Sequence, residues 1–253
     1  MTKQPFILIL AGTTEARKLI AALLEQLPAA RIVASFAGAV SKLPDVEVET
    51  RIGGFGGATG MAHYLQSEEV DLVIDATHPY AAIISGNAVI ACNKTKVPLL
   101  RLVRPEWKAD EADQWEHFPN IVALSNALPE GARPFLAIGK KQIGTFLHRS
   151  DVSAVVRMIE TPEMPVPSSW QLIQSRPLDT VEAEQALFEE NNITHLVCKN
   201  SGGSRSYAKI EAARALELPV LMIDRPPLAP AESFEEIDEL IGKCSELFAR
   251  DVA

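Results

Sequence analysis

The chain has 253 residues, of which 47% are hydrophobic and 23% are charged. This composition is that of an ordinary globular protein and excludes disordered, collagen-like and coiled-coil classes. The 24 Lys and Arg residues against 33 Asp and Glu give a net charge of −9. A chain this acidic is a poor partner for nucleic acid or an anionic membrane, so an anionic ligand needs a local basic site.

The three cysteines, Cys92, Cys198 and Cys244, are far apart and form no CxxC pair. We therefore expect no disulfide framework and no metal site, and a cytoplasmic location. No run of about 18 apolar residues is present, so no membrane-spanning segment is expected. The short apolar run near the start is interrupted at Gly12 and Thr13, which favours a first strand over a signal peptide.

Short apolar runs alternate with segments of helical periodicity along the first half of the chain. The predicted strands are residues 6–10, 32–36, 46–52, 70–75 and 98–102, and the predicted helices are residues 14–27, 61–68 and 81–93. Apolar runs this dense, separated by helices, are typical of parallel strands that are covered on both faces. The pattern predicts a doubly wound α/β lobe.

Residues 104–120 interrupt this alternation with two prolines, two tryptophans and an acidic cluster, and the predicted domain linker lies here. The alternation then resumes. Strands are expected at residues 135–138, 153–159, 170–174, 195–199 and 219–223, with helices at 141–147, 180–190, 206–216 and 233–248. The prediction is two Rossmann-like lobes with mostly parallel sheets, residues 1–118 and 119–253, and ligands in a cleft between them.

Two glycine turns each join a predicted strand to a predicted helix. The first is LAGTTEAR, with Gly12 followed by Thr13, Thr14 and Glu15, and the second is KNSGG, which begins at Lys199. Such turns expose backbone N–H groups to an anion at a helix start. The alternative for the first is a plain tight turn with a Thr N-cap. A weaker turn of this kind follows residue 138.

The segment RIGGFGG holds four glycines around Phe55. Glycines at this density favour a loop with unusual dihedral angles. A flexible linker is the alternative, but a linker would favour Ser over a single Phe. We therefore expect a loop that contacts a ligand.

The segment DATHPYA places Asp75, His78 and Tyr80 at the carboxyl end of a predicted parallel strand, followed by Ser85. Open α/β sheets bind ligands at this edge, so a catalytic group is expected here. The alternative is a helix cap with a solvent-facing histidine. The segment from Arg101 to Trp107 adds a second arginine and an aromatic face, which suit carboxylates and a conjugated ring, or a packed salt bridge between domains.

These segments together resemble the precorrin-6A reductase family of cobalamin biosynthesis. The matching pieces run in the family's order from about residue 8 to about residue 228, and the combination of DATHPYA with KNSGG is specific. The resemblance implies reduction of a conjugated tetrapyrrole, precorrin-6A to precorrin-6B, by NADPH. The many carboxylates of such a substrate call for Arg and Lys donors rather than a metal, and we expect a monomer or weak homo-oligomer. The family has an arginine where this chain has Ala39. NADH therefore stays open, unless Ser41 or Lys42 replaces the missing arginine.

The expected site residues fall into three groups. The catalytic candidates are Asp75, His78 and Tyr80, with His78 as the proton donor and water as the alternative donor. The expected cofactor contacts are Gly12, Thr13, Thr14, Glu15, Ser35, Gly38, Gly54, Phe55 and Gly56. The expected substrate contacts are Ser85, Arg101, Arg104, Trp107, Lys199, Asn200, Ser201, Gly202, Gly203 and Lys209.

Three other functions stay open at the level of the sequence. A cobalt-precorrin-6A reductase would use the same residues on a metal-loaded macrocycle. A non-catalytic nucleotide-binding module would keep the glycine turns without using the Asp75–Tyr80 cluster. A sugar-phosphate enzyme would use only the turn that begins at Lys199. Nicotinamide oxidation that depends on a tetrapyrrole separates the reductases from the other two.

Overall fold

The computed structural model describes residues 4–37, 46–162, 164–204 and 206–250. The chain forms two compact units. Unit 1 comprises Met1–Arg104 and Pro227–Ala253, and unit 2 comprises Pro105–Pro226. Each unit contains one six-stranded sheet in which every described strand pair is parallel. The predicted fold class, two Rossmann-like α/β lobes, is confirmed.

The sheet of unit 1 has the strand order β12-β5-β4-β1-β2-β3. Its strands are β1 (Phe6–Leu10), β2 (Arg31–Phe36), β3 (Glu49–Ile52), β4 (Leu72–Asp75), β5 (Leu99–Leu102) and β12 (Glu232–Phe234). Its helices are α1 (Thr14–Gln26), α2 (Gly57–Ser67), α3 (Ala82–Thr95) and α7 (Ile237–Arg250).

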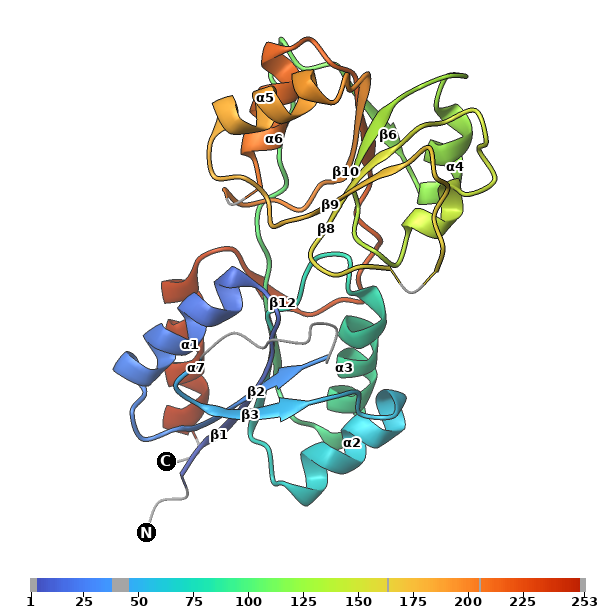
Figure 1. The fold of residues 1–253 in the computed structure, drawn as a ribbon. Coiled ribbons are helices and arrows are strands. Elements are labelled where there is room, and N and C mark those ends of the chain that lie inside the picture. Colours follow the sequence, from blue (N-terminus) through green and yellow to red (C-terminus); the bar gives the residue numbers. More distant parts are fainter. Residues whose placement is uncertain (1–3, 38–45, 163, 205, 251–253) are drawn as a thin grey trace. The chain divides into compact units, whose positions relative to one another are not determined.

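The side chains of β1 explain why helices cover both faces of this sheet. Ile7 and Ile9 pack in one apolar cluster with residues of α1 and α7. Phe6, Leu8 and Leu10 pack in another with residues of α2 and α3. Successive side chains of a strand point to opposite faces, so an unbroken apolar strand requires cover on both. Figure 1 shows α1 and α7 on one side of the sheet and α2 and α3 on the other.

The sheet of unit 2 has the strand order β6-β11-β10-β7-β8-β9. Its strands are β6 (Trp115–Phe118), β7 (Pro134–Ala137), β8 (Val155–Met158), β9 (Gln171–Gln174), β10 (His195–Lys199) and β11 (Val220–Ile223). Its helices are α4 (Ile121–Ala127), the 3₁₀-helix η1 (Ile143–Phe146), α5 (Val181–Glu190) and α6 (Ala208–Ala215). Residues of α5 and α6 share an apolar cluster with β7, β8, β10 and β11, and α4 contacts η1.

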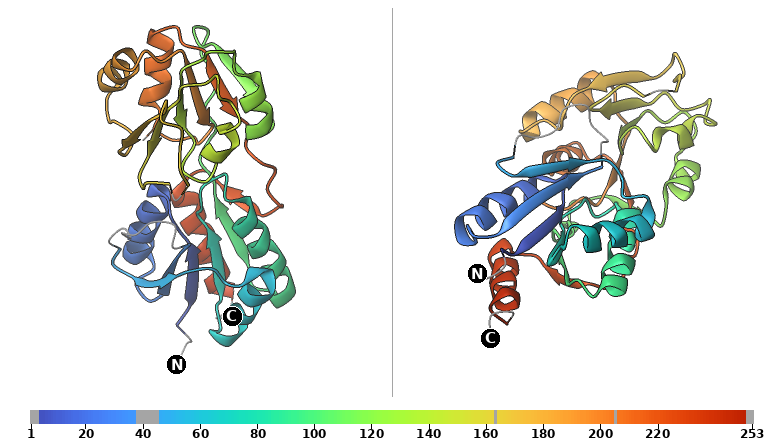
Figure 2. Two further views of the ribbon diagram at one scale, coloured as in Figure 1. Left: turned by 45° about the vertical axis from the view of Figure 1, so that its right-hand side comes forward. Right: turned by 90° about the horizontal axis from the view of Figure 1, so that it is seen from below.

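The structure divides the chain at a different place from the predicted boundary, which was after residue 118. The unit boundary lies at residues 104 and 105, and the chain returns to unit 1 from residue 227. The reason is tertiary pairing, because β12 adds a parallel strand beside β5 and α7 packs against α1. The turned views of Figure 2 also show the red C-terminal helix near the blue helix α1.

Three predicted elements also differ from the structure. The predicted linker contains β6, an edge strand paired with β11. Its two apolar residues, Trp115 and Phe118, are three positions apart and follow an acidic cluster, so they give no alternating pattern that would predict a strand. The helix predicted over residues 233–248 starts later, because its first residues form β12. The helix predicted over residues 141–147 is the four-residue 3₁₀-helix η1.

Candidate active site

The turn between β1 and α1 is open toward solvent. Gly12 has φ +127°, and a side-chain carbon built on it would meet nothing within 4 Å. Only glycine adopts this backbone conformation readily. Because α1 begins at Thr14, its first backbone N–H groups lie beside an accessible turn. A phosphate group fits such a turn on geometric and electrostatic grounds.

The three residues after Gly12 are engaged within unit 1. The Thr13 hydroxyl caps α1 by accepting from the Ala16 N–H at 3.0 Å, and it donates to the Ala76 carbonyl at 2.8 Å. The Thr14 hydroxyl accepts from Arg17 at 3.2 Å. The side chain of Thr13 therefore ties the turn to the end of β4, and its proton is not free for the ligand contact that the sequence suggested.

Glu15 and Arg104 form an ion pair, although the sequence assigned them to different ligands. The carboxylate of Glu15 lies 3.5 Å from Nη1 of Arg104. Both side chains are largely buried, and burial lowers the pKa of Arg104 while Glu15 raises it. The pair joins the first turn of α1 to the segment after β5.

The loop after β3 is shaped around Arg51, the first residue of the RIGGFGG segment, which was not among the predicted site residues. Its guanidinium donates to the Gly53 and Gly54 carbonyls at 2.6 and 2.8 Å, and lies over the Phe55 ring at 3.7 Å. A side-chain carbon on Gly60 would lie 1.8 Å from the Phe55 carbonyl oxygen, so glycine is required there. These contacts give the loop a defined conformation, which a flexible linker would lack.

Several of the expected cofactor residues lie at or near this loop. Gly54, Phe55 and Gly56 belong to it, and Ser35 is a buried residue of β2. Gly38, Ser41 and Lys42 lie outside the described residues.

Asp75 is the centre of a buried polar network at the end of β4. It accepts from the Thr77 hydroxyl at 2.7 Å and from Arg101 Nε at 3.0 Å. Arg101 also donates to the Ala229 carbonyl at 2.9 Å. The Ser85 hydroxyl lies 3.3 Å from that of Thr77. Since Asp75 and Arg101 are only 2% and 4% exposed, they form a buried ion pair.

This network differs from the predicted roles. Asp75 was expected to orient His78, and its carboxylate pairs with Arg101 instead. Arg101 was expected to meet a substrate carboxylate, and it is buried with its charge neutralised. The sequence placed both residues at the correct edge of the sheet, but their pairing depends on β4 and β5 being neighbours.

His78 and Tyr80 lie together just beyond this network, and both are half-buried. Their ring centroids are 5.6 Å apart. The Tyr80 backbone N–H donates to Nδ1 of His78 at 3.3 Å. A neutral imidazole that accepts at Nδ1 carries its proton at Nε2, so His78 presents Nε2–H as a donor.

A small cavity adjoins this histidine. It is lined by residues that include His78, Ser85 and Arg101, and its volume is about 10 Å³. That volume corresponds to about one water molecule. Among the described residues, no atom accepts a hydrogen bond from the buried Nη2 of Arg101. The cavity suits a single water or one oxygen of a ligand.

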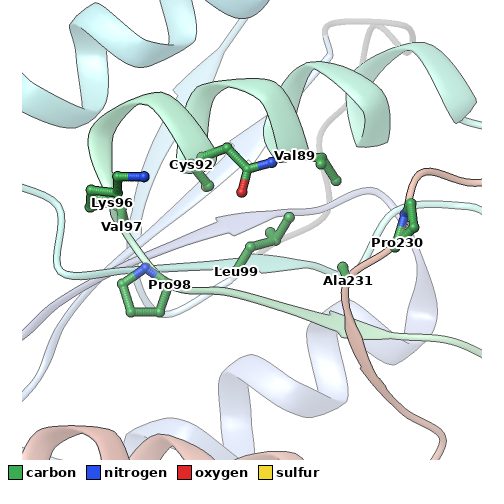
Figure 3. Close-up of a pocket in the computed structure, with 9 residues that line it drawn as sticks. Val89, Cys92, Lys96, Val97, Pro98, Leu99, Pro230 and Ala231 are labelled. Atoms are coloured by element: carbon green, nitrogen blue, oxygen red, sulfur yellow. The ribbon is translucent and has the colours of Figure 1, made fainter.

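A larger hollow of about 330 Å³ lies elsewhere in unit 1. Figure 3 shows Val89 and Cys92 projecting from α3 toward Leu99 of β5, with Pro230 and Ala231 at the other end. It contains none of the residues that the sequence selected. Burial raises the pKa of the Cys92 thiol to about 12, so this cysteine is not a reactive thiolate.

In unit 2, the glycine turn after β10 lies beside the turn after β7. Nζ of Lys199 donates to the Ile138 carbonyl at 2.9 Å. Burial, with a smaller contribution from Lys141, lowers the Lys199 pKa to about 8. Gly202 and Gly203 have φ of 66° and 70°. Positive charge and turn amides therefore meet at the carboxyl edge of this sheet, with Ser201 in the same turn.

Four expected substrate residues in unit 2, Trp107, Asn200, Gly203 and Lys209, contact one another. The buried Asn200 amide accepts from the Trp107 N–H at 2.9 Å and donates to the Trp107 carbonyl at 3.0 Å. The Trp107 indole donates to the Gly203 carbonyl at 2.7 Å. Lys209 is 4% exposed and lies 4.6 Å above the Trp107 ring, and burial lowers its pKa to about 8. Trp107 was predicted to offer an aromatic face to a ligand, but Lys209 covers one face of its indole ring.

The described part of the chain gathers no three His, Cys, Asp or Glu side chains in a way that could hold a metal ion. Among the helices that the structure describes, none has the length and apolar character needed to cross a membrane.

Comparisons with known proteins agree along nearly the whole chain. The family model described as Precorrin-6x reductase CbiJ/CobK matches residues 6–245. The precorrin-6A reductase of Rhodococcus erythropolis is 43% identical over 239 residues, 93% of this chain and 94% of that protein. The solved structure of CobK precorrin-6A reductase has a TM-score of 0.89 and 38% identity, covering 96% of this chain and 97% of that one.

A relative with a different name is more distant. The cobalt-precorrin-6A reductase of Priestia megaterium is 27% identical over 251 residues, 93% of this chain and 96% of that protein. The extent of the family match and the identity to the Rhodococcus protein lead to one conclusion. This chain belongs to the precorrin-6x reductase CbiJ/CobK family.

Proposed function

We propose that the protein is a precorrin-6A reductase, which uses NADPH to reduce the precorrin-6A macrocycle to precorrin-6B in cobalamin biosynthesis. One observation carries this choice. The chain is 43% identical to a relative named for the metal-free substrate and 27% identical to one named for the cobalt-loaded substrate, each across 93% of its length. The metal-free macrocycle is therefore the preferred substrate.

Unit 1 supplies the residues that would hold the cofactor. The accessible turn at Gly12 and the N-terminus of α1 suit a pyrophosphate, and the ordered loop after β3 suits the adenosine half. When bound, the reduced nicotinamide supplies a hydride. The chain's task is to hold donor and acceptor face to face and to exclude water.

Lys199 and the N–H groups of the turn at Ser201–Gly203 are the proposed partners for the acetate and propionate groups of the macrocycle. The contacts of Arg101, Arg104 and Lys209 within their own units make these three residues supports of the site. Ser85 likewise supports the Asp75 network through Thr77.

His78 is the proposed proton donor. Reduction of one double bond adds a hydride to one atom and a proton to the other, and the imidazole that follows β4 is a side chain suited to give that proton near neutral pH. Asp75 contributes indirectly, because its network fixes the strand end from which His78 projects.

The test measures NADPH oxidation with precorrin-6A and with cobalt-precorrin-6A, and then single-turnover rates of His78→Asn and Tyr80→Phe against pH. We expect oxidation that depends on the metal-free tetrapyrrole. For His78→Asn we expect a rate lower by about 10²-fold without titration near neutrality. Tyr80→Phe keeps the backbone N–H and is the matched control.

Two outcomes contradict parts of this proposal. Nucleotide binding without oxidation in the presence of either macrocycle would identify a non-catalytic nucleotide-binding module. A His78→Asn variant that loses only substrate affinity, with an intact single-turnover rate, would make His78 a binding residue and water the proton donor.

A further inference from the structure

Arg51 lies at the edge of the sheet where the adenosine half of a dinucleotide is expected. It stands opposite Ser35 in the register of β2 and β3, and its Nη1 is 3.4 Å from the Ser35 hydroxyl. Dinucleotides cross the carboxyl ends of such sheets, with the phosphates at the first glycine turn and the ribose of adenosine near the end of the second strand. With the cofactor in unit 1, as proposed above, Arg51 lies beside that ribose.

The guanidinium of Arg51 is fixed in place by neutral groups. It donates to the Gly53 and Gly54 carbonyls and lies 3.7 Å from the Phe55 ring centroid and 5.2 Å from that of Tyr64. Phe55 and Tyr64 are themselves in edge contact at 5.2 Å. The side chain is therefore pre-organised, which reduces the entropy that ligand binding would cost.

The positive charge of Arg51 is not neutralised by an acid in the described part of the chain. Glu49 and Glu68, whose charges act on neighbouring Tyr64, pair with Arg31 at 2.9 and 4.0 Å. The three hydrogen bonds of Arg51 use at most three of its five N–H groups. At least two donors and a full positive charge are left for an anion.

The sequence near the end of β2 also favours a phosphate over a ribose hydroxyl. Proteins that bind NAD place an Asp or Glu here to accept from the 2′-hydroxyl. This chain has no acidic residue from Arg31 to Lys42. A carboxylate at this place would repel a 2′-phosphate, and its absence beside a fixed guanidinium favours one.

We propose that Arg51 binds the 2′-phosphate of NADPH and thereby sets the preference for NADPH over NADH. This proposal rests on the proposed function, since it requires the cofactor in unit 1. The family resemblance pointed to an arginine directly after the second strand, where this chain has Ala39. The parallel pairing of β3 with β2 instead brings Arg51 beside Ser35, although the two residues are 16 positions apart in the chain.

The test is calorimetric titration with NADP⁺, NAD⁺ and adenosine 2′,5′-bisphosphate, which reports binding rather than turnover. For Arg51→Gln we expect the Kd of NADP⁺ and of the bisphosphate to rise about 10- to 100-fold. The Kd of NAD⁺ should change less than about 3-fold, because NAD⁺ lacks the phosphate. Arg51→Lys keeps the positive charge but lacks the paired N–H donors of a guanidinium, so it should lose an intermediate amount of affinity for NADP⁺ and the bisphosphate.

Lys94→Gln is the matched control, because it also removes one positive charge from unit 1, in the last turn of α3, and leaves the pairs of Glu49 and Glu68 with Arg31 intact. We expect it to leave all three affinities unchanged. Equal losses of NADP⁺ and NAD⁺ in Arg51→Gln would overturn the proposal and leave Arg51 as a support of the loop or a stacking partner of adenine. Unchanged affinities in a folded Arg51→Gln protein would also overturn it.

The two proposals fail in different ways. A wild-type protein that binds NADP⁺ through Arg51 but never reduces precorrin-6A contradicts the proposed function and leaves the role of Arg51 intact. A wild-type protein that reduces precorrin-6A but binds NADP⁺ and NAD⁺ equally contradicts only the role of Arg51.

Discussion

The two units have the same strand arrangement but different turns after their first central strand. In each sheet, a run of five strands connected in sequence is extended by a sixth edge strand, β12 in unit 1 and β6 in unit 2. In both units, a glycine with positive φ follows the first central strand, Gly12 after β1 and Gly139 after β7. In unit 1 the 13-residue helix α1 follows, and in unit 2 the four-residue 3₁₀-helix η1 follows. Because a short 3₁₀-helix has little dipole, equal topology does not give equal phosphate sites.

The charges at the fourth strand of each run also differ. Asp75 at the end of β4 is neutralised by Arg101 inside unit 1. At the matching place in unit 2, Lys199 at the end of β10 donates to a backbone carbonyl and lies near a second cation, Lys141. Each member of a buried ion pair depends on the other for a counter-charge, whereas an excess of positive charge attracts an anion.

Asp75→Asn gives the largest effect expected from this comparison. It leaves the buried guanidinium of Arg101 without a counter-charge, so the free energy of unfolding should fall by about 3–5 kcal/mol. Lys199→Met in unit 2 should leave it unchanged or slightly higher, because burial disfavours this charge in the folded protein. Urea unfolding of both variants measures the difference, and equal losses would contradict the contrast between the two strand ends.

Gly12→Val and Gly139→Val test whether the cofactor belongs to unit 1. Both glycines have positive φ, and a side-chain carbon on either meets nothing within 4 Å, so the two changes impose similar backbone strain. We expect Gly12→Val to raise the KM for NADPH about 10²-fold and Gly139→Val to leave it unchanged. Steady-state kinetics on folded variants measure this. The reverse pattern would move the cofactor to unit 2.

If Lys199 binds a carboxylate of the macrocycle, as proposed, we expect substrate use to depend on pH. Because burial and Lys141 lower its pKa to about 8 from the ordinary 10.5, the folded protein loses this proton as pH rises above about 8. A neutral amine cannot pair with a carboxylate. We therefore expect kcat/KM for the macrocycle to fall about 10-fold between about pH 7 and pH 9. Lys199→Arg should keep kcat/KM constant over this pH range, because arginine stays charged. If kcat/KM of that variant falls in the same way, a group other than Lys199 causes the pH dependence.

Dense apolar strands made most of the fold predictable from the sequence. The strand at residues 195–199 and that at residues 6–10 were predicted with the bounds that the structure gives them. The edge strands β6 and β12 were not predicted, because each carries few apolar residues and is recognisable only through its partner strand. The assignment of the C-terminal segment to unit 1 follows from that same pairing.

The sequence by itself also determined which chemical groups stand at the carboxyl edges of the strands, because a motif's place after a strand is a local property. It placed Gly12, Asp75, His78 and Lys199 there. Only the tertiary structure decided which of these groups neutralise one another. Arg101 meets Asp75 across 26 residues, Trp107 meets Asn200 across 93, and Arg51 reaches Ser35 through strand pairing. Such contacts depend on the order and register of the strands, which no local pattern of residues encodes.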